Sequence, residues 1–112
     1  MDVAVEHRER VTVVAVTGSI DALTAGALVS ALSTQVGEGR TRLVADFTQV
    51  DYTSSAGLRA ILGALKETRQ QGGDFRLAGV QANVRKVLDL SGFTNILKFY
   101  PDVDAAVLSF AE

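Results

Sequence analysis

The apolar positions at the start of the chain predict two β-strands joined by a short charged connection. Residues 3–5 and 11–17 are rich in valine and threonine, which favour strands, and charged side chains separate the two runs. The second run is apolar on both of its alternating faces, as expected for a central strand that is covered on each side. We predict an opening hairpin whose second strand ends at Gly18.

Helical spacing first appears after this hairpin. Beyond Thr24, the apolar residues Leu28, Leu32 and Val36 recur at intervals that place them on one face of a helix, and glycine ends the pattern at Gly37. We therefore predict a first helix that begins near Thr24.

A buried strand and the most regular helix of the chain come next. Residues 43–47 form a short, mostly apolar run, which is typical of a buried parallel strand followed by a polar loop. Leu58, Ile61 and Leu65 then follow helical spacing, while charged residues occupy the opposite face. We expect this helix to end at Gly72, because glycine commonly follows the last helical turn.

The last third of the chain continues the same order. It contains a predicted strand at residues 75–80, a helix marked by Val84 and Leu88, a short strand at residues 96–100 and a terminal helix after Pro101. Because strands and helices alternate almost throughout, we predict an α/β fold, with a mixed sheet of four to five strands and about four helices packed on it. Right-handed crossovers would place the functional loops at the carboxyl ends of the strands.

Composition limits the number of domains and the class of partner. The 112 residues are 47% apolar, which suffices for one modest core, and we assign residues 1–112 to a single domain. Thirteen acidic and eleven basic residues give a net charge of −2 without any block of like charge, which favours a protein or small-ligand partner. The chain has no cysteine, no leader pattern and no apolar run near the roughly 20 residues of a membrane span. We expect a cytoplasmic protein without membrane insertion or direct nucleic-acid contact.

Familiar catalytic motifs are missing. His7 is the only histidine, and we expect it in an exposed turn, so a Ser-His-acid triad has little support. The sequence has no G-x-S-x-G elbow, no G-x-x-x-x-G-K-[ST] phosphate loop and no H-E-x-x-H metal pair. We predict that the protein is not an enzyme and uses no metal or cofactor.

Residues 46–59 run from the buried strand into the clearest helix and carry the most informative side chains. Ser54 and Ser55 precede that helix, where serine commonly accepts hydrogen bonds from free N–H groups, so capping alone would explain them. Gly57 is a poor helix former, which suggests that a large group approaches the serines where its side chain is missing. Arg59 lies where the helix dipole favours acids, which suggests an anionic contact.

This segment resembles a known family. Residues 50–58, Val-Asp-Tyr-Thr-Ser-Ser-Ala-Gly-Leu, are similar to the signature loop of STAS domains, which include bacterial anti-sigma factor antagonists and the cytoplasmic tails of sulfate transporters. The pair Gly18 and Asp21 resembles the family's turn between the second strand and the first helix. The pattern from Gly72 to Phe93 resembles its second half, so the likeness spans almost the whole domain.

The resemblance implies a switch that is set by phosphorylation. Antagonists commonly have Asp-Ser-Ser/Thr-Gly-Leu in this loop, and the first serine, which corresponds to Ser55, is the phosphorylated one. By this likeness, the unphosphorylated protein binds an anti-sigma factor serine kinase and so regulates sigma-factor-dependent transcription. Phosphorylation releases the protein, and a serine phosphatase of the metal-dependent type resets it. The implied partner-binding residues are Asp21, Thr24, Thr53, Ser54, Ser55, Ala56, Gly57 and Arg59.

Two departures from the family loop leave alternatives open. Ser54 replaces the family aspartate and Ala56 replaces serine or threonine, so Ser54 is the alternative phosphorylation site to Ser55. Arg59 is either a contact for the phosphate, four residues along the helix, or a solvated side chain. The alternative functions are a non-phosphorylated STAS accessory subunit of a lipid or anion transport complex, a nucleotide-binding sensor whose pocket includes Asp21, and an independent serine hydrolase.

Overall fold

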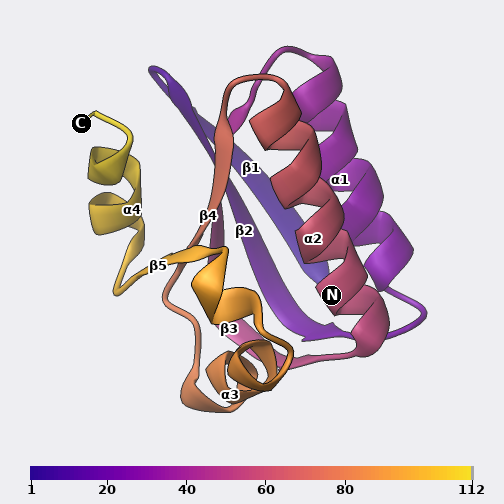
Figure 1. Ribbon diagram of the computed structural model, residues 1–112. Coiled ribbons are helices and arrows are strands. Elements are labelled where there is room, and N and C mark those ends of the chain that lie inside the picture. Colours follow the sequence, from indigo (N-terminus) through magenta and orange to yellow (C-terminus); the bar gives the residue numbers. More distant parts are fainter. Residues whose placement is uncertain (112) are drawn as a thin grey trace.

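The computed structural model describes residues 1–111 as a mixed β-sheet with helices on both faces (Figure 1). The strand order is β1-β2-β3-β4-β5, with β1 antiparallel to β2 and every other neighbouring pair parallel. The strands are β1 (Asp2–Arg8), β2 (Val11–Ile20), β3 (Arg42–Thr53), β4 (Asp74–Ala78) and β5 (Lys98–Tyr100). The helices are α1 (Ala25–Gly37), α2 (Ser55–Gln70), α3 (Ala82–Leu90), α4 (Val103–Ser109) and a short 3-10 turn, η1 (Phe93–Asn95). The predicted α/β class and element order are confirmed.

The strand β2 has helices against both of its faces, which explains why its sequence is apolar at consecutive positions. Val14 and Val16 belong to the larger core, which also contains the buried faces of α1 and α2. Val11 and Val13 point the other way, into a smaller core that contains Ala106 of α4. Figure 1 shows α4 on the opposite side of the sheet from α1 and α2. The prediction of a central strand covered on each side is therefore confirmed.

Two predicted strand ends were wrong because β2 and β3 pair further than their apolar residues indicate. Gly18 does not end β2 but lies within it, with φ +98° beside a register shift against β3, and the strand continues to Ile20. The residues expected as a polar loop after Phe47 continue β3 to Thr53, which pairs with Ile20. The extension carries both strands up to the first turn of the following helix.

The placement of His7 also differs from the sequence prediction. His7 lies on β1 opposite Thr12, and its Nδ1 atom is 3.3 Å from the Thr12 hydroxyl. The turn of the hairpin is formed by Glu9 and Arg10, and Glu9 has a positive φ of 25°. The charged connection is therefore shorter than expected, and the histidine is part of the antiparallel pairing.

The parallel strands give the sheet two distinct ends. We call the end at which β2 and β3 finish, at Ile20 and Thr53, the carboxyl end. The amino end is where β2, β3 and β4 begin, at Val11, Arg42 and Asp74. Both α1 and α2 start at the carboxyl end, as right-handed crossovers predict. This arrangement places the segment that resembles the STAS signature loop at the carboxyl end.

Candidate functional site

The junction between β3 and α2 is held by Ser54, which caps the helix. Its hydroxyl accepts a hydrogen bond from the Gly57 N–H at 3.3 Å, and its own backbone N–H donates to the Ile20 carbonyl at 2.8 Å. The backbone of Ser54 is extended, with φ −90° and ψ 176°, as is usual for a capping residue. Ser54 therefore ties the start of α2 to the end of β2, and capping accounts for one of the two serines.

Ser55 is the first residue of α2 and is exposed to solvent. Within residues 1–111, its hydroxyl makes no hydrogen bond, since the capping role belongs to Ser54. The backbone N–H groups of Ser55 and Ala56 also lack acceptors in this part of the chain, as expected in the first turn of a helix. An exposed hydroxyl thus lies beside two unused donors at the positive end of a helix dipole.

Gly57 has a structural role that differs from the one expected from sequence. It is buried, and a Cβ atom added to it would collide with Thr53 Oγ1 and lie 2.8 Å from Ile20 Cγ2. Glycine is therefore needed so that the first turn of α2 can approach the ends of β2 and β3 closely. The missing side chain allows this internal packing and does not open a path to the serines.

The loop between β2 and α1 lies next to this junction and is closed by its own hydrogen bonds. Asp21 Oδ1 accepts from the N–H groups of Leu23 and Thr24, each at 2.9 Å, and from the Thr24 hydroxyl at 3.0 Å. The Thr24 hydroxyl in turn accepts from the Asp21 N–H at 2.9 Å. The hydrogen bond from the Thr24 backbone, followed by that from its hydroxyl, holds the pKa of Asp21 below its usual range. Asp21 is thus an ionised carboxylate that fixes the entry into α1.

The predicted partner-binding residues fall into three groups by depth. Asp21 and Thr24 are half-buried in the first loop, and Thr53 and Gly57 lie beneath the surface. Ser54 and Ala56 are half-buried, whereas Ser55 and Arg59 are exposed. Arg59 is the fifth residue of α2, one turn beyond Ser55, so the dipole of the first turn acts on it less than the sequence suggested. Of the eight predicted residues, Ser55 and Arg59 are therefore the two whose side chains are exposed.

Two exposed apolar side chains of this surface were not among the candidates from sequence. Leu23, in the loop after β2, is 93% exposed, and Tyr52, near the end of β3, is 52% exposed. Large apolar groups in the open commonly anchor protein interfaces. The signal that could have found Leu23 is an apolar residue within a short polar loop, between the strand and the first helical position.

Side chains at the start of α3 form hydrogen bonds with the backbone of the extended part of β3. The Asn83 side chain donates to the Asp51 carbonyl at 2.7 Å, and the Gln81 side chain donates to the Thr48 carbonyl at 3.0 Å. On the other edge, the Ser19 hydroxyl donates to Asp51 Oδ1 at 2.8 Å. These contacts fix the polar stretch of β3 that leads to the serines. No sequence pattern predicted these contacts, because the extension of β3 was itself not expected.

The mixed sheet and the loop at its carboxyl end define a small α/β domain, and comparison with known proteins identifies its family. Residues 2–106 match the model of the STAS domain. The chain therefore belongs to the STAS family, as the loop at residues 50–58 suggested.

Within this family, several relatives similar in sequence are named antagonists of anti-sigma factors. The relative named anti-sigma factor antagonist BtrV, from Bordetella bronchiseptica, is 37% identical over 93 residues, which cover 83% of this chain and 80% of the relative. The anti-sigma-B factor antagonist of Listeria monocytogenes is 34% identical over 102 residues, covering 88% of this chain and 89% of the relative. The crystal structure of an anti-sigma factor antagonist from Mycobacterium paratuberculosis superposes with a TM-score of 0.90 at 28% identity, covering 99% of this chain and 94% of the other.

Residues 1–111 contain neither a membrane-spanning helix nor a cluster of metal ligands. None of the helices there combines the length and the apolar content that crossing a bilayer requires. In the same residues, no three histidine, cysteine, aspartate or glutamate side chains gather in a way that could hold a metal ion.

Proposed function

We propose that this protein is an anti-sigma factor antagonist that binds an anti-sigma factor serine kinase and is released when Ser55 is phosphorylated. The relatives named above are antagonists, which supports the class of activity. The observation that favours Ser55 is that the two serines at the start of α2 differ: Ser54 caps the helix, whereas the Ser55 hydroxyl is exposed. A kinase can reach that hydroxyl without removing a hydrogen bond on which the fold depends.

The start of α2 also suits the phosphorylated state. A phosphate adds about 1.5 to 2 negative charges at neutral pH, which a helix N-terminus stabilises through its dipole and its unused N–H groups. The N–H groups of Ser55 and Ala56 are the unused donors here. The fold is therefore expected to persist on phosphorylation, and the change is one of surface charge.

Release of the partner follows from where that charge appears. Ser55 lies on the same end of the molecule as the exposed side chains of Leu23 and Tyr52, which we expect to contact the partner. A dianion brought into a desolvated interface without a matching cation weakens binding strongly. The partner thus recognises the neutral serine and rejects its phosphate.

Arg59 is the cation placed to act on the phosphate itself. It lies four residues after Ser55, an interval that brings side chains together on one helix face, and its own side chain is exposed. A charge-assisted contact would hold the phosphate and slow the metal-dependent phosphatase that removes it. We expect Arg59→Ala to change the rate of dephosphorylation more than it changes the affinity of the unmodified protein for its kinase.

Mass spectrometry after incubation with ATP and the cognate kinase tests the assignment of the site. We expect one phosphate on Ser55 in the wild type and in Ser54→Ala, and none in Ser55→Ala. A phosphate that persists in Ser55→Ala and disappears in Ser54→Ala would assign the site to Ser54 instead.

A pull-down with and without ATP tests the switch. The kinase should be captured without ATP and lost with it, whereas Ser55→Ala should retain the kinase in both conditions and Ser55→Asp should bind it weakly in both. Capture that ATP does not change would instead favour a fixed accessory subunit of a transport complex. A direct titration with ATP or GTP alone, without the kinase, separates the nucleotide-sensor alternative.

A further inference from the structure

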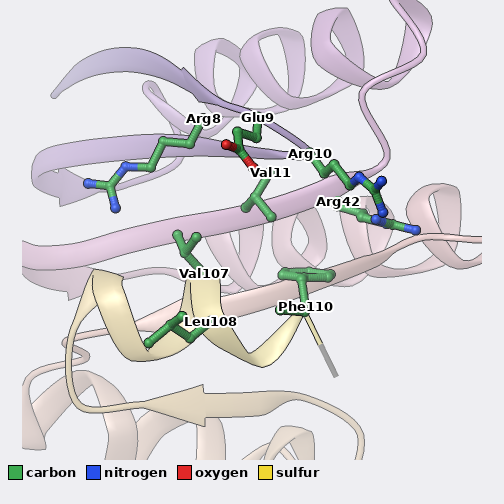
Figure 2. Close-up of a pocket in the computed structure, with 9 residues that line it drawn as sticks. Arg8, Glu9, Arg10, Val11, Arg42, Val107, Leu108 and Phe110 are labelled. Atoms are coloured by element: carbon green, nitrogen blue, oxygen red, sulfur yellow. The ribbon is translucent and has the colours of Figure 1, made fainter.

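A second candidate surface lies at the amino end of the sheet, away from Ser55. A groove with a volume of about 610 Å³ runs between the turn of the β1–β2 hairpin, the start of β3 and the end of α4. Figure 2 shows Arg8, Arg10 and Arg42 above it and Val107, Leu108 and Phe110 below it. One wall of the groove is therefore basic and the other is apolar. We refer to it as the basic groove.

The basic groove continues into a neighbouring hollow. This second hollow, of about 320 Å³, shares Glu9, Arg10 and Arg42 with the first and extends to Arg40 in the loop between α1 and β3. The backbone N–H of Arg40 donates to the Gln35 carbonyl at 2.9 Å, which holds that loop against the end of α1. The two hollows therefore meet at Arg10 and Arg42, with the apolar residues of α4 lining the first and Arg40 lining the second.

The guanidinium groups of the two hollows differ in whether an acid neutralises them. Arg8 is paired with Glu6 and Asp104, so its charge is already matched. Within residues 1–111, Arg10, Arg40 and Arg42 have no carboxylate within 4.0 Å, and the Nε atom of Arg40 is buried without an acceptor. Among the described residues that line the two hollows, Glu9 is the only one with a carboxylate. The three arginines without an acidic partner in residues 1–111 thus outnumber the acids of this lining.

The apolar wall is partly open to water. Leu108 on α4 is 68% exposed, and Phe110 lies under Arg76, with the guanidinium carbon 3.9 Å from the ring centre. The stacked pair holds the Phe110 ring in place, so the wall is fixed before any ligand arrives. An apolar side chain could be buried against Leu108 and Phe110 while charged groups reach the arginines.

We propose that the basic groove binds an extended, acidic segment of a partner protein, with an apolar residue at the α4 end and carboxylates toward Arg40. The planar guanidinium group pairs with carboxylates through two parallel hydrogen bonds, which suits Arg10 and Arg42 to this ligand. Because the apolar residues of α4 line the first hollow and Arg40 lines the second, a ligand that reaches both must be an extended chain. Since the groove lies at the opposite end of the sheet, its occupation is independent of the proposed phosphorylation of Ser55.

A fluorescence polarisation titration with a labelled peptide, Leu-Phe-Gly-Asp-Glu-Asp-Glu-Asp, tests this proposal on the full chain. We expect saturable binding that weakens as salt rises from about 50 to about 200 mM, because exposed charge pairs are screened. Arg10→Ala/Arg42→Ala should weaken binding by about tenfold or more, since it removes two charge-assisted contacts. The matched control is Lys66→Ala/Lys86→Ala, which removes the same charge from exposed positions on α2 and α3 and should leave affinity unchanged.

Two further measurements complete the test. The same peptide with Asn and Gln in place of its acids should not bind, and Leu108→Asp should weaken binding of the acidic peptide while the fold is retained. In an NMR titration, the amide shifts should concentrate at residues 8–12, 40–42 and 107–111, and Ser55→Asp should bind as tightly as the wild type.

Each contrary result overturns the proposal. The proposal is wrong if the acidic peptide does not bind saturably at low salt. It is also wrong if the two double substitutions lower peptide affinity equally, or if the NMR amide shifts centre on residues 21–24 and 53–59. Arginine-dependent binding to phosphatidylserine vesicles, without peptide binding, would assign the groove to a membrane surface instead.

Discussion

At the carboxyl end of the sheet, Asp21 and Ser54 are occupied by hydrogen bonds from nearby N–H groups, and the exposed Ser55 hydroxyl is left over. At the amino end, the polar side chains include several arginines. Some of these are paired with acids, as Arg76 is with Asp74 at 3.0 Å, while others, such as Arg10, have no carboxylate within 4.0 Å in residues 1–111. At the carboxyl end, Asp21 and Ser54 are hydrogen-bonded to groups nearby in the chain. At the amino end, Arg10 has no acidic partner within residues 1–111.

The difference shows two ways in which a small domain can hold a group ready for a partner. Near Ser55, the side-chain cap of α2 comes from Ser54, so a modification of the Ser55 hydroxyl changes the surface without removing an internal contact. In the basic groove, Arg10, Arg40 and Arg42 have no carboxylate within 4.0 Å in residues 1–111, so a bound anion could pair with them. Variants that disturb one end should therefore behave differently from the equivalent variants at the other.

Removal of Asp74 is expected to have the largest effect. Asp74 is only 8% exposed and accepts hydrogen bonds, each at 3.0 Å, from Arg69, Arg76 and the Phe75 N–H. Asp74→Ala leaves the 12%-exposed Arg76 side chain without its acid, so we expect the free energy of unfolding to fall by about 3 kcal/mol. The measurement is urea denaturation.

The matched control lies at the carboxyl end. The exposed Asp51 carboxylate accepts one hydrogen bond, from Ser19, so Asp51→Ala should cost less than about 1 kcal/mol. Equal losses for Asp51→Ala and Asp74→Ala would contradict the contrast between an exposed acid and a buried acid network.

Gly57→Ala is expected to have the next largest effect. The added Cβ would collide with Thr53 Oγ1 and press on Ile20, so the free energy of unfolding should fall by about 1 to 3 kcal/mol. Gly63 provides the control in the same helix, because a Cβ there meets no atom within 4 Å. Gly63→Ala should instead stabilise the protein by about 0.5 to 1 kcal/mol through helix propensity. A gain in stability for both variants would show that α2 does not need glycine at Gly57.

Gly57 also illustrates how far the sequence alone could go. Apolar periodicity was enough to predict the order of elements, the coverage of β2 on both faces and the start of α2, because these depend on local pattern. The close approach of Gly57 to Ile20 was not predictable, since it depends on β2 continuing past Gly18. The same extension carries β3 to Thr53.

The features that the sequence did not reveal are those that join distant segments. Asp21 was a candidate for partner contact, but its closed ring of hydrogen bonds with Thr24 emerged only from the backbone path of the loop. The basic groove combines Arg10, Arg40 and Arg42 from separate segments with the end of α4, and no run of like charge marks it in the sequence. Tertiary pairing, rather than residue propensity, determines both features.

The two serines at the start of α2 should differ in their effect on stability. Ser54→Ala removes the cap to the Gly57 N–H, so we expect a loss of about 1 kcal/mol in the free energy of unfolding. Ser55→Ala removes an exposed hydroxyl that makes no hydrogen bond within residues 1–111 and should change stability by less than about 0.5 kcal/mol. Urea denaturation of the two variants in parallel is the measurement. If Ser55→Ala proves the more destabilising, the assignment of the cap to Ser54 is wrong.

The smallest expected effect is the contribution of Asp21 to acid stability. Hydrogen bonds from Thr24 lower the pKa of Asp21 in the folded chain, so the native state binds fewer protons than the unfolded state at mildly acidic pH. The resulting stabilisation is fully present above the unfolded pKa of about 3.9 and is lost as pH falls through the lower folded pKa. Asp74 behaves in the same direction, because hydrogen bonds from Arg76 and Arg69 outweigh the burial that would raise its pKa.

Comparison of urea midpoints at about pH 5 and about pH 3 isolates the Asp21 part of this dependence. Asp21→Asn keeps an oxygen that can accept from the N–H groups of Leu23 and Thr24, but it removes the ionisable group. Its loss of stability between the two pH values should therefore be smaller than that of the wild type. If Asp21→Asn and the wild type lose the same stability, the closed loop at the carboxyl end does not depend on the charge of Asp21. Its hydrogen bonds would then act through geometry alone.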